Sequence, residues 1–413
     1  MSINRIKLIG ASVVITCNKY FEIIKNGGIL FDNDRILKIG DFYELQKSKK
    51  IQGIFYNSSV ITPAFLNAHI HFEFSNNNTL LKYGNFGEWL DSVIKNRNEL
   101  LQDSRDSIKE AIKESLKSGV VSVGAISSNG IDLEPLSQSP LKVVFFNEIM
   151  GTSEENLEQI KDDFDTRFKK SLLLSNERFR AAIALHSPYS LHNKLATYAI
   201  ERAKEHKMLL SAHFLESKEE LLWLEFNKGY FKNFFKQNNP KPFYTRESFL
   251  RLFSECESLF THCLYLNNDD FAYISKLNAD IVSCPRSNRL LNNRYFNFFK
   301  AMDFKLPLII ATDGKSSNNS LNILDEARVA LFAYHNFNIN FLAKEILLSI
   351  TARPAKRLKF NNGFLEKNQA SDFAIFNIKD IDKSTQIPLD FILKAKEVQD
   401  LYINGERIDI ENY

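Results

Sequence analysis

The sequence lacks the features that would mark a disulfide-rich, secreted or membrane-spanning protein. Its four cysteines, Cys17, Cys256, Cys263 and Cys284, are far apart and form no C-x-x-C pair, which fits a reducing compartment and gives no disulfide framework. The longest apolar run near the N-terminus, Leu8–Cys17, is too short to span a bilayer and lacks a small-residue cleavage signal. We therefore expect a cytoplasmic protein without a membrane partner.

A concentration of charge of one sign is also absent. The formal net charge is +3 and the basic residues form no tract, so we expect no nucleic acid as a partner. No internal repeat of short period is visible. A chain of 413 residues, with 44% hydrophobic and 25% charged residues, is typical of a globular enzyme with one large domain and a smaller one.

The pattern of apolar runs changes twice along the chain. Residues 1–60 and 363–413 hold short strand-like runs separated by turn signals such as Asn26-Gly27-Gly28, whereas residues 61–362 alternate short apolar runs with longer amphipathic segments. That alternation is typical of repeated β-α units with a parallel sheet. The candidate strands are Val60–Ala68, Val120–Ala125, Lys142–Ile149, Arg180–Leu185, Met208–His213, Leu259–Leu264, Ala279–Val282 and Pro307–Ala311.

Eight candidate strands are enough for a (β/α)8 barrel. We therefore predict an α/β fold in which residues 61–362 form a (β/α)8 TIM barrel. The terminal segments, 1–60 and 363–413, are predicted to pair into a small composite β-sandwich domain, because chain termini often lie close together.

One stretch, Thr62–Ser75, carries the first chemical signal. It reads T-P-A-F-L-N-A-H-I-H-F-E-F-S and places His69 and His71 two positions apart. Residues two apart in a β-strand share a face, so both imidazoles can reach one metal ion from a strand end. Taken alone, the pair could equally be two histidines on a half-buried strand.

Polar side chains also follow several other predicted strands directly, at the edge where barrels build active sites. His186, His213, His262 and Asp313 each come after an apolar run, and Glu216 lies three residues after His213. Three histidines and one aspartate make a sound mononuclear site for zinc or ferrous iron. Such an ion lowers the pKa of a bound water, and a nearby carboxylate such as Glu216 can move protons.

Four motifs, P-A-F-L-N-A-H-I-H, H-F-L-E, T-H-C and T-D-G, resemble those of the amidohydrolase superfamily, in its branch of cytosine/adenosine-type deaminases and chlorohydrolases. The resemblance covers essentially the whole chain. It implies the metal ligands His69, His71, His213 and Asp313, the proton shuttle Glu216, the hydroxide-orienting His262 and the substrate-contacting His186. Binuclear relatives use a carboxylated lysine, but Phe146–Ile149 holds none, so we expect one divalent ion, with zinc favoured and iron as the alternative.

Narrower features resemble one subgroup, the aminofutalosine deaminases of the alternative menaquinone pathway. They are the runs F-G-E-W-L from Phe86, H-F-L-E-S from His213, C-P-R-S-N from Cys284 and T-D-G-K-S-S-N from Thr312. The implied reaction is hydrolytic deamination of 6-amino-6-deoxyfutalosine to futalosine and ammonia. Deaminases of methylthioadenosine or S-adenosylhomocysteine and dechlorinating relatives are the nearer alternatives, and a non-catalytic scaffold on the same fold is the remote one.

The resemblance also implies a mechanism. Glu216 would protonate ring N1 of the 6-aminopurine, which makes C6 electrophilic. Asp313 would accept the proton of the attacking water while His262 holds the nucleophile against C6. Glu216 would then deliver a proton to the amino group, so that ammonia leaves.

Specificity is expected to come from polar contacts beyond the base. Glu88 and His186 are the candidates for the ribose hydroxyls, although Glu88 could equally be a first-turn helix residue. The expected substrate carries a benzoate, and Arg286 or Arg289 is predicted to bind its carboxylate through the guanidinium fork. Each arginine could equally brace its own loop. The phenylalanine-rich segment 223–243 could be a lid, a dimer contact or plain helix packing, so a homodimer is left open.

Overall fold

The computed structural model describes residues 6–413 apart from residues 78, 103, 237 and 238. The chain divides into two compact units. One comprises the residues up to Asn67 together with Lys113–Ser122 and Asn322–Tyr413, and the other comprises Ala68–Ile112 and Val123–Leu321. The domain bounds expected from the sequence, 1–60 with 363–413 and 61–362, stay a prediction.

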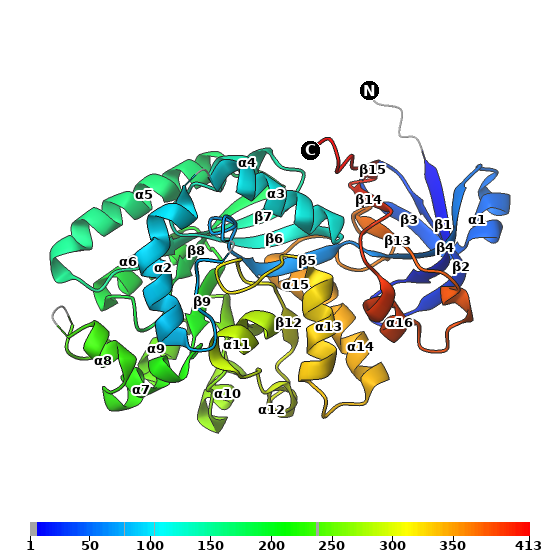
Figure 1. The fold of residues 1–413 in the computed structure, drawn as a ribbon. Coiled ribbons are helices and arrows are strands. Elements are labelled where there is room, and N and C mark those ends of the chain that lie inside the picture. Colours follow the sequence, from blue (N-terminus) through cyan, green and yellow to red (C-terminus); the bar gives the residue numbers. More distant parts are fainter. Residues whose placement is uncertain (1–5, 78, 103, 237–238) are drawn as a thin grey trace. The chain divides into compact units, whose positions relative to one another are not determined.

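Eight parallel strands form a nearly closed barrel, which confirms the predicted (β/α)8 architecture (Figure 1). In chain order and in sheet order they are β5 (Phe65–Ile70), β6 (Val120–Ser127), β7 (Lys142–Ile149), β8 (Phe179–Leu185), β9 (Leu210–Phe214), β10 (Ser258–His262), β11 (Ala279–Ser283) and β12 (Leu308–Ile310). Just beyond β12 the backbone N–H of Asp313 donates to the carbonyl of His69 in β5 (3.1 Å), so the first and last strands meet at their carboxyl ends.

The barrel strands are mainly apolar because they are buried on both faces. Every residue of β6 and β7 is buried. Gly124 in β6 has a specific packing role, because a Cβ atom there would lie 2.3 Å from the carbonyl oxygen of Ala68 in β5. Any other residue would force these neighbouring strands apart.

Helices follow most of the strands along the chain. They are α2 (Phe86–Leu101), α3 (Ser104–Lys117), α4 (Leu133–Gln138), α5 (Leu157–Leu173), α6 (Asn193–Glu205), α7 (Lys218–Phe226), α8 (Tyr230–Phe234), α9 (Arg246–Arg251), α10 (Asn268–Ile274), α11 (Pro285–Asn292), α12 (Phe298–Asp303), α13 (Ile323–Ala333), α14 (Ile339–Ser349) and α15 (Ala352–Leu358). Helix α5 packs against β7 and β8 through Leu157, Phe164 and Phe168, which share one helical face (Figure 1). No helix among the described residues is both long and apolar enough to cross a bilayer.

The terminal segments of the chain pair with each other in a separate mixed sheet. Its strand order is β15-β14-β13-β4-β1-β2-β3, where the strands are β1 (Lys7–Ile15), β2 (Ile23–Phe31), β3 (Ile36–Asp41), β4 (Ile54–Pro63), β13 (Phe373–Asn377), β14 (Asp400–Ile403) and β15 (Glu406–Arg407). Strand β13 from the C-terminal segment runs antiparallel to β4, with Phe373 opposite Pro63. Two helices, α1 (Phe42–Lys49) and α16 (Ile387–Lys394), accompany this sheet. The expected β-sandwich is thus refined to one hydrogen-bonded sheet.

Two local expectations are corrected by the structure. Asn26-Gly27-Gly28 was expected to be a turn but lies inside β2, where Gly28 pairs with Gly10 of β1. A Cβ atom on Gly10 would lie 2.4 Å from the ring of Phe42, so glycine here makes room for α1.

The predicted strand Val60–Ala68 is divided between the two sheets. Strand β4 ends at Pro63 and β5 begins at Phe65, and between them the Ala64 N–H donates to the Asp372 carbonyl (3.2 Å). Pro63 stands at this break and is the signal that could have indicated it, because proline cannot donate to a strand ladder.

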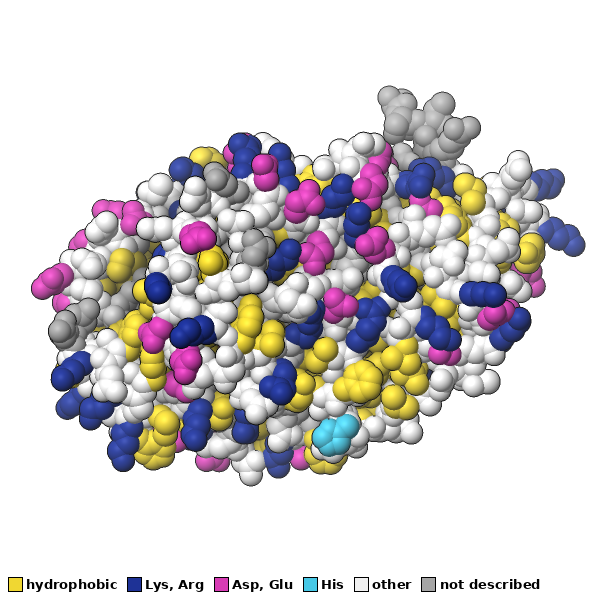
Figure 2. Space-filling view, in the orientation of Figure 1, with side chains coloured by type: hydrophobic (Ala, Val, Ile, Leu, Met, Phe, Trp, Pro, Cys, Tyr) yellow, Lys and Arg dark blue, Asp and Glu magenta, His cyan; other side chains and the backbone are white. Residues whose placement is uncertain are grey.

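The surface is mixed in charge. Figure 2 shows basic and acidic side chains interspersed across the face that it presents. This distribution agrees with the small net charge of +3.

Candidate active site

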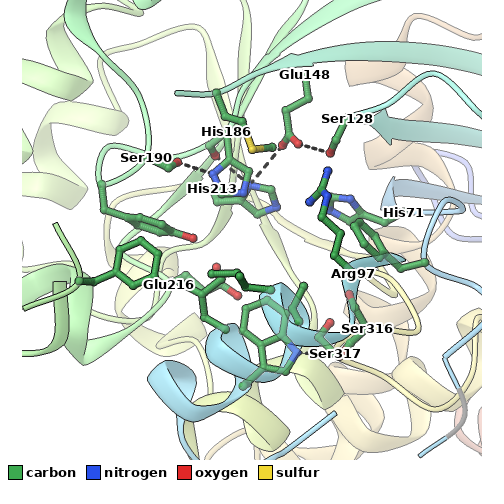
Figure 3. A pocket seen from close by; sticks show the side chains of 18 of the residues that line it. His71, Arg97, Ser128, Glu148, His186, Ser190, His213, Glu216, Ser316 and Ser317 are labelled. Atoms are coloured by element: carbon green, nitrogen blue, oxygen red, sulfur yellow. Dashed lines mark hydrogen bonds and ion pairs between the residues drawn. The ribbon is translucent and has the colours of Figure 1, made fainter. Parts of the chain in front are cut away.

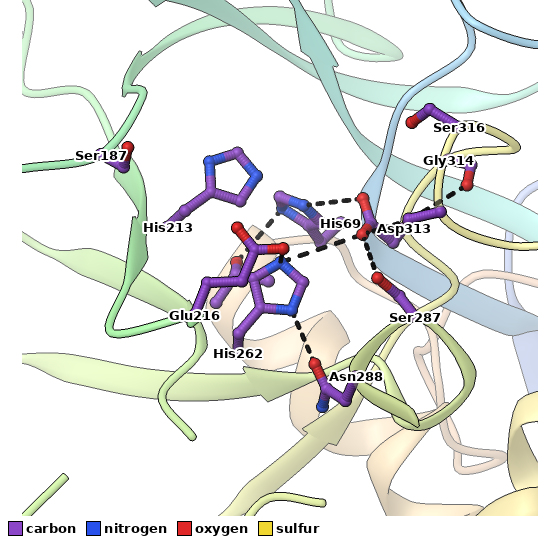
Figure 4. A network of polar contacts seen from close by, with 12 residues as sticks. His69, Ser187, His213, Glu216, His262, Ser287, Asn288, Asp313, Gly314 and Ser316 are labelled. Atoms are coloured by element: carbon purple, nitrogen blue, oxygen red, sulfur yellow. Dashed lines mark hydrogen bonds and ion pairs between the residues drawn. The ribbon is translucent and has the colours of Figure 1, made fainter. Parts of the chain in front are cut away.

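Five side chains converge at the carboxyl ends of the barrel strands. His69 and His71 come from the end of β5, His213 from β9, His262 from the end of β10 and Asp313 from the loop after β12. Figure 4 shows His69, His213, His262 and Asp313. The two Nε2 atoms of His69 and His71 lie 3.3 Å apart, and each lies within 3.6 Å of Asp313 Oδ1. The cluster that the sequence predicted at this edge is therefore present as a compact group.

The donor atoms of this cluster fit a divalent metal ion. His69, His71 and Asp313 form one group whose ligand atoms lie within 4.8 Å of one another, and His69, His213 and His262 form another. The Nε2 atom of His262 is buried and has no hydrogen-bond partner among the described residues, which a site for an ion and a water would explain. Neutral imidazoles and a carboxylate are donors that zinc or ferrous iron binds.

Burial sets the protonation states that metal binding needs. It lowers the pKa of His71 to about 3 and that of His213 well below its usual value, so both imidazoles are neutral. Burial alone would raise the pKa of Asp313, but contact with His69 and the neighbouring His262 and His71 holds it well below its usual value. Asp313 is therefore ionised and able to act as a ligand or a proton acceptor.

Neighbouring polar groups fix the orientation of these side chains. Oδ2 of Asp313 accepts hydrogen bonds from the hydroxyls of Ser287 and Ser317, both at 2.7 Å. Nδ1 of His213 donates to the backbone carbonyl of His186 (2.8 Å), which leaves its Nε2 as the atom available to an ion.

His262 is oriented by Asn288. Its Nδ1 lies 2.8 Å from Asn288 Oδ1, and the amide nitrogen of Asn288 donates to the hydroxyl of Ser283 (3.2 Å). With the amide oxygen facing His262, Nδ1 carries the proton and Nε2 has the lone pair. Nε2 lies 3.4 Å from Glu216 Oε1 and 3.9 Å from Asp313 Oδ2, so His262 presents an acceptor to the centre of the site (Figure 4).

The backbone at these strand ends is strained. His262 and Asp313 have φ values of 71° and 60°, and Leu215 before Glu216 has 47°. Residues other than glycine seldom adopt this left-handed region, and such outliers cluster at functional sites. Gly314, which follows Asp313, packs so tightly that a Cβ atom there would lie 2.8 Å from Cβ of His71.

Glu216 lies in the loop after β9, which is held by a second buried glutamate. Both carboxylate oxygens of Glu220 accept backbone N–H groups, one from Leu215 and one from Glu216, each at 3.0 Å. Burial raises the pKa of Glu216 well above its usual value, and the charges of Asp313 and Glu220 add to the effect. Its surroundings therefore favour the protonated form of Glu216 beside the cluster.

The supporting role of Glu220 was not assigned from the sequence. A signal was present, because Ser217 and Glu220 have the S-x-x-E spacing of a helix capping box. Ser217 does cap α7, accepting from the Glu220 N–H at 3.1 Å, but the Glu220 side chain turns to the loop before the helix. The spacing predicts a helix start and cannot indicate that second role.

A cavity of about 300 Å³ opens above the cluster (Figure 3). His71, His213, Glu216 and Asp313 line its base, and His186 lines its wall. The remaining wall is largely apolar and aromatic, formed mainly by Phe74, Trp89, Leu90, Val93, Ile94, Met150, Tyr189, Phe234 and Phe235. A flat aromatic base with an apolar substituent fits such a wall.

His186 lines this cavity, and its contact with a substrate stays a prediction. Its Nδ1 lies 2.5 Å from the Ser190 hydroxyl and 3.1 Å from that of Ser187. Burial lowers the pKa of His186 to about 4, and the positive charge of Arg97 adds to the effect, so the ring is neutral. A neutral imidazole can exchange hydrogen bonds with a substrate hydroxyl.

Three predicted substrate contacts do not line the cavity. Glu88 is exposed on the first turn of α2, Arg286 is hydrogen-bonded to Asn319, and Arg289 is exposed on α11. Their roles toward a substrate stay predictions.

Arg97 of α2, which the sequence analysis did not single out, does line the cavity. The four-residue spacing of Trp89, Val93 and Arg97, which share one face of α2, is the signal that could have found it.

Part of the phenylalanine-rich segment 223–243 forms the wall of the cavity. Phe231 is fully buried, with its ring centroid 4.1 Å from that of Tyr189 and 6.3 Å from that of Phe86. Phe234 and Phe235 face the cavity. This segment therefore packs on the site itself, while residues 237 and 238 lie outside the described part of the chain.

The family model of the amidohydrolase family matches residues 60–408. The match includes all the residues of the cluster described above. The chain therefore belongs to the amidohydrolase family.

The similar proteins indicate which reaction within the family this chain catalyses. The chain is 40% identical to an adenosine deaminase of Helicobacter pylori over 97% of this chain and 99% of that protein. It is 38% identical to an aminodeoxyfutalosine deaminase of Nitratiruptor sp. over 84% of this chain and 87% of that protein. The crystal structure of Helicobacter pylori aminofutalosine deaminase with methylthio-coformycin superposes with a TM-score of 0.92 at 40% identity, covering 97% of this chain and 100% of that one. Family and relatives together identify the enzyme's chemistry as hydrolytic deamination.

Proposed function

We propose that this enzyme deaminates 6-amino-6-deoxyfutalosine, a 6-aminopurine nucleoside, to futalosine and ammonia in menaquinone biosynthesis. The observation that carries the proposal is the buried Glu216, whose pKa is raised by burial, beside a histidine–aspartate cluster at the base of a cavity with aromatic walls. Two of the similar proteins carry the name of this deaminase, which supports the choice of nucleoside.

One divalent ion would be held by His69, His71, His213 and Asp313, with zinc favoured and iron as the alternative. When bound, it supplies an activated water at neutral pH. Nothing in the donor set separates the two metals, because imidazole and carboxylate suit both.

The residues of the chain carry the proton transfers. Glu216 donates its proton to ring N1, which makes C6 electrophilic. Asp313 accepts a proton from the attacking water, and the lone pair on Nε2 of His262 accepts a hydrogen bond from the same molecule. Nε2 and Asp313 Oδ2 lie 3.9 Å apart, so one water can contact both. Glu216, now ionised, takes the proton of the new C6 hydroxyl and delivers it to the amino group, so ammonia leaves as C6 becomes a carbonyl. The proton held by Asp313 then returns to Glu216, which restores the starting protonation states.

The substrate would be held by contacts around the cavity. His186 faces the cavity and is proposed to bind a ribose hydroxyl, with Glu88 as the second candidate. The carboxylate of the benzoate was assigned from the sequence to Arg286 or Arg289.

A methylthioadenosine or S-adenosylhomocysteine deaminase is the second candidate. The solved relative binds methylthio-coformycin, which favours room for a small 5′ group in a site of this kind. A panel of adenosine compounds with different 5′ groups, assayed for ammonia release, separates the two. We expect the highest kcat/KM for aminofutalosine; a clear preference for methylthioadenosine would refute the proposed substrate and leave the deamination chemistry in place. Chloride release from a chlorinated heterocycle without ammonia release from any nucleoside would indicate a chlorohydrolase instead.

A further inference from the structure

One face of helix α2 forms a side of the cavity. Trp89, Val93 and Arg97 recur at intervals of four residues, so their side chains share that face, and all three line the cavity. The indole N–H of Trp89 donates to the carbonyl of Ser316 (2.7 Å), which fixes the N-terminal part of the helix against the site. Arg97 therefore stands at a defined distance along the wall, two turns beyond Trp89.

Arg97 is the one lysine or arginine among the described residues that line the cavity (Figure 3). Its Nη2 donates to Oδ1 of Asn129 (2.8 Å), and the Asn129 amide nitrogen in turn donates to Glu73 Oε2 (3.0 Å). These bonds orient Asn129 and hold one edge of the guanidinium. Its other N–H groups bond to no described residue, and no described carboxylate lies within ion-pair distance of it.

The space beside Arg97 continues into a second cavity. That cavity shares Arg97, Ser128, Glu148 and Met150 with the first and extends to Arg167. Arg167 is already engaged, because its guanidinium donates to the carbonyls of Ser127 (3.3 Å) and Glu148 (2.8 Å). Arg97 is thus the cation that lines both cavities, and it makes one hydrogen bond to a described residue where Arg167 makes two.

A cation on an apolar wall implies an anionic ligand group, since an unpaired charge in such surroundings is unfavourable. We propose that Arg97 binds the carboxylate at the far end of the nucleoside's 5′-substituent and thereby selects an anionic substrate over a neutral one. This inference rests on the proposed function. The planar guanidinium fork matches a carboxylate, and Trp89 supplies an aromatic surface for the ring that bears it. Arg97 would take the role that the sequence suggested for Arg286 or Arg289.

The test compares two substrates in the same variants. Arg97→Met, which keeps most of the apolar stem, should lower kcat/KM for aminofutalosine by about 10- to 150-fold, the value of one charge-assisted hydrogen bond. The loss for methylthioadenosine, which has no carboxylate, should be far smaller. Arg97→Lys should give an intermediate loss for aminofutalosine, because a point charge replaces the fork.

Lys95→Met is the matched control, since Lys95 is an exposed cation on the same helix and does not line the cavity. Lys95→Met should leave kcat/KM for both substrates at the parent values. If Arg97→Met lowers kcat/KM equally for both substrates, Arg97 only braces the wall and the inference is wrong. The proposed deamination reaction would still stand. If Arg286→Met gives the substrate-selective loss and Arg97→Met does not, the carboxylate is bound at the other arginine. If the parent deaminates neither nucleoside, the proposed function itself fails.

Discussion

Replacing Glu216 by glutamine gives the sharpest test of the proposed chemistry. Glutamine keeps the shape of the side chain but has no acidic proton to give to ring N1. General acid–base catalysis is typically worth about 100- to 10,000-fold in rate, which corresponds to about 2.7–5.4 kcal/mol of activation free energy at 1.36 kcal/mol per tenfold. We therefore expect Glu216→Gln to lower kcat by a factor in this range.

The structure favours a loss of kcat in the upper part of that range, because no other acid is placed to replace Glu216. Asp313, the nearest other carboxyl group, is held ionised and cannot act as the acid. Glu148 also lines the cavity, but its carboxyl lies beside Ser128 and His213, away from Glu216 (Figure 3). No other acidic side chain among the described residues lines this cavity.

The assay is ammonia release at saturating substrate, together with metal content and melting temperature. The side chain of Glu216 makes no hydrogen bond to a described residue, only the 3.4 Å contact with His262, so the variant should keep its fold and its metal. Glu219→Gln is the matched control, because Glu219 lies in the first turn of α7 and does not line the cavity. It should behave as the parent.

The pH profile gives a second readout. Glu216 acts in its protonated form, so the rate of the parent should fall as pH rises through the pKa of Glu216. That pKa is raised, so the fall should come at higher pH than for an ordinary glutamate. In Glu216→Gln this limb should be absent. Activity within about threefold of the parent, with the limb intact, would show that another group moves the proton.

Three further predictions follow from the site and its supports. Metal analysis should give about one divalent ion per chain with loss of turnover after chelation, and two ions per chain or full activity without metal would contradict the single site. Asn288→Leu removes the acceptor that orients His262, so kcat should fall by about 10- to 100-fold while the melting temperature changes little; an unchanged kcat would show that the ring needs no such support. Burial raises the pKa of Glu220 from 4.5 to about 8, so folded protein holds a proton that unfolded chain releases, and stability should fall as pH rises across this window. Melting temperatures measured at a series of pH values should therefore decline more steeply for the parent than for Glu220→Gln, and equal slopes would assign the decline to other groups.

The barrel could be predicted because the burial of its strands leaves a recognisable pattern of apolar runs in the sequence. Strands buried on both faces are mainly apolar, so each appears as a short run such as Lys142–Ile149, which the structure reproduces as β7. Polar residues that interrupt the pattern at a strand end, such as His262 and Asp313, stand out against these runs. Their convergence then follows from the geometry of parallel strands.

The walls of the site could not be predicted in the same way. Arg97 and Glu88 are both charged residues on α2, and only the packing of that helix decides that Arg97 faces the cavity and Glu88 the solvent. Arg286 lies close to the site along the chain, yet its guanidinium is bonded to Asn319. Side-chain direction from a helix depends on tertiary contacts between segments far apart in sequence, and a motif read along the chain does not contain them.

The left-handed backbone at His262 and Asp313 has a consequence for engineering. Conformations of this kind cost about 1–3 kcal/mol each for residues other than glycine, and here the residues must be histidine and aspartate for chemical reasons. A selection for heat resistance alone would accept glycine or asparagine at both positions, because these residues relieve the strain. Stabilised variants recovered there should have lost turnover, so a search for a more durable catalyst has to keep these two positions fixed and gain its stability elsewhere.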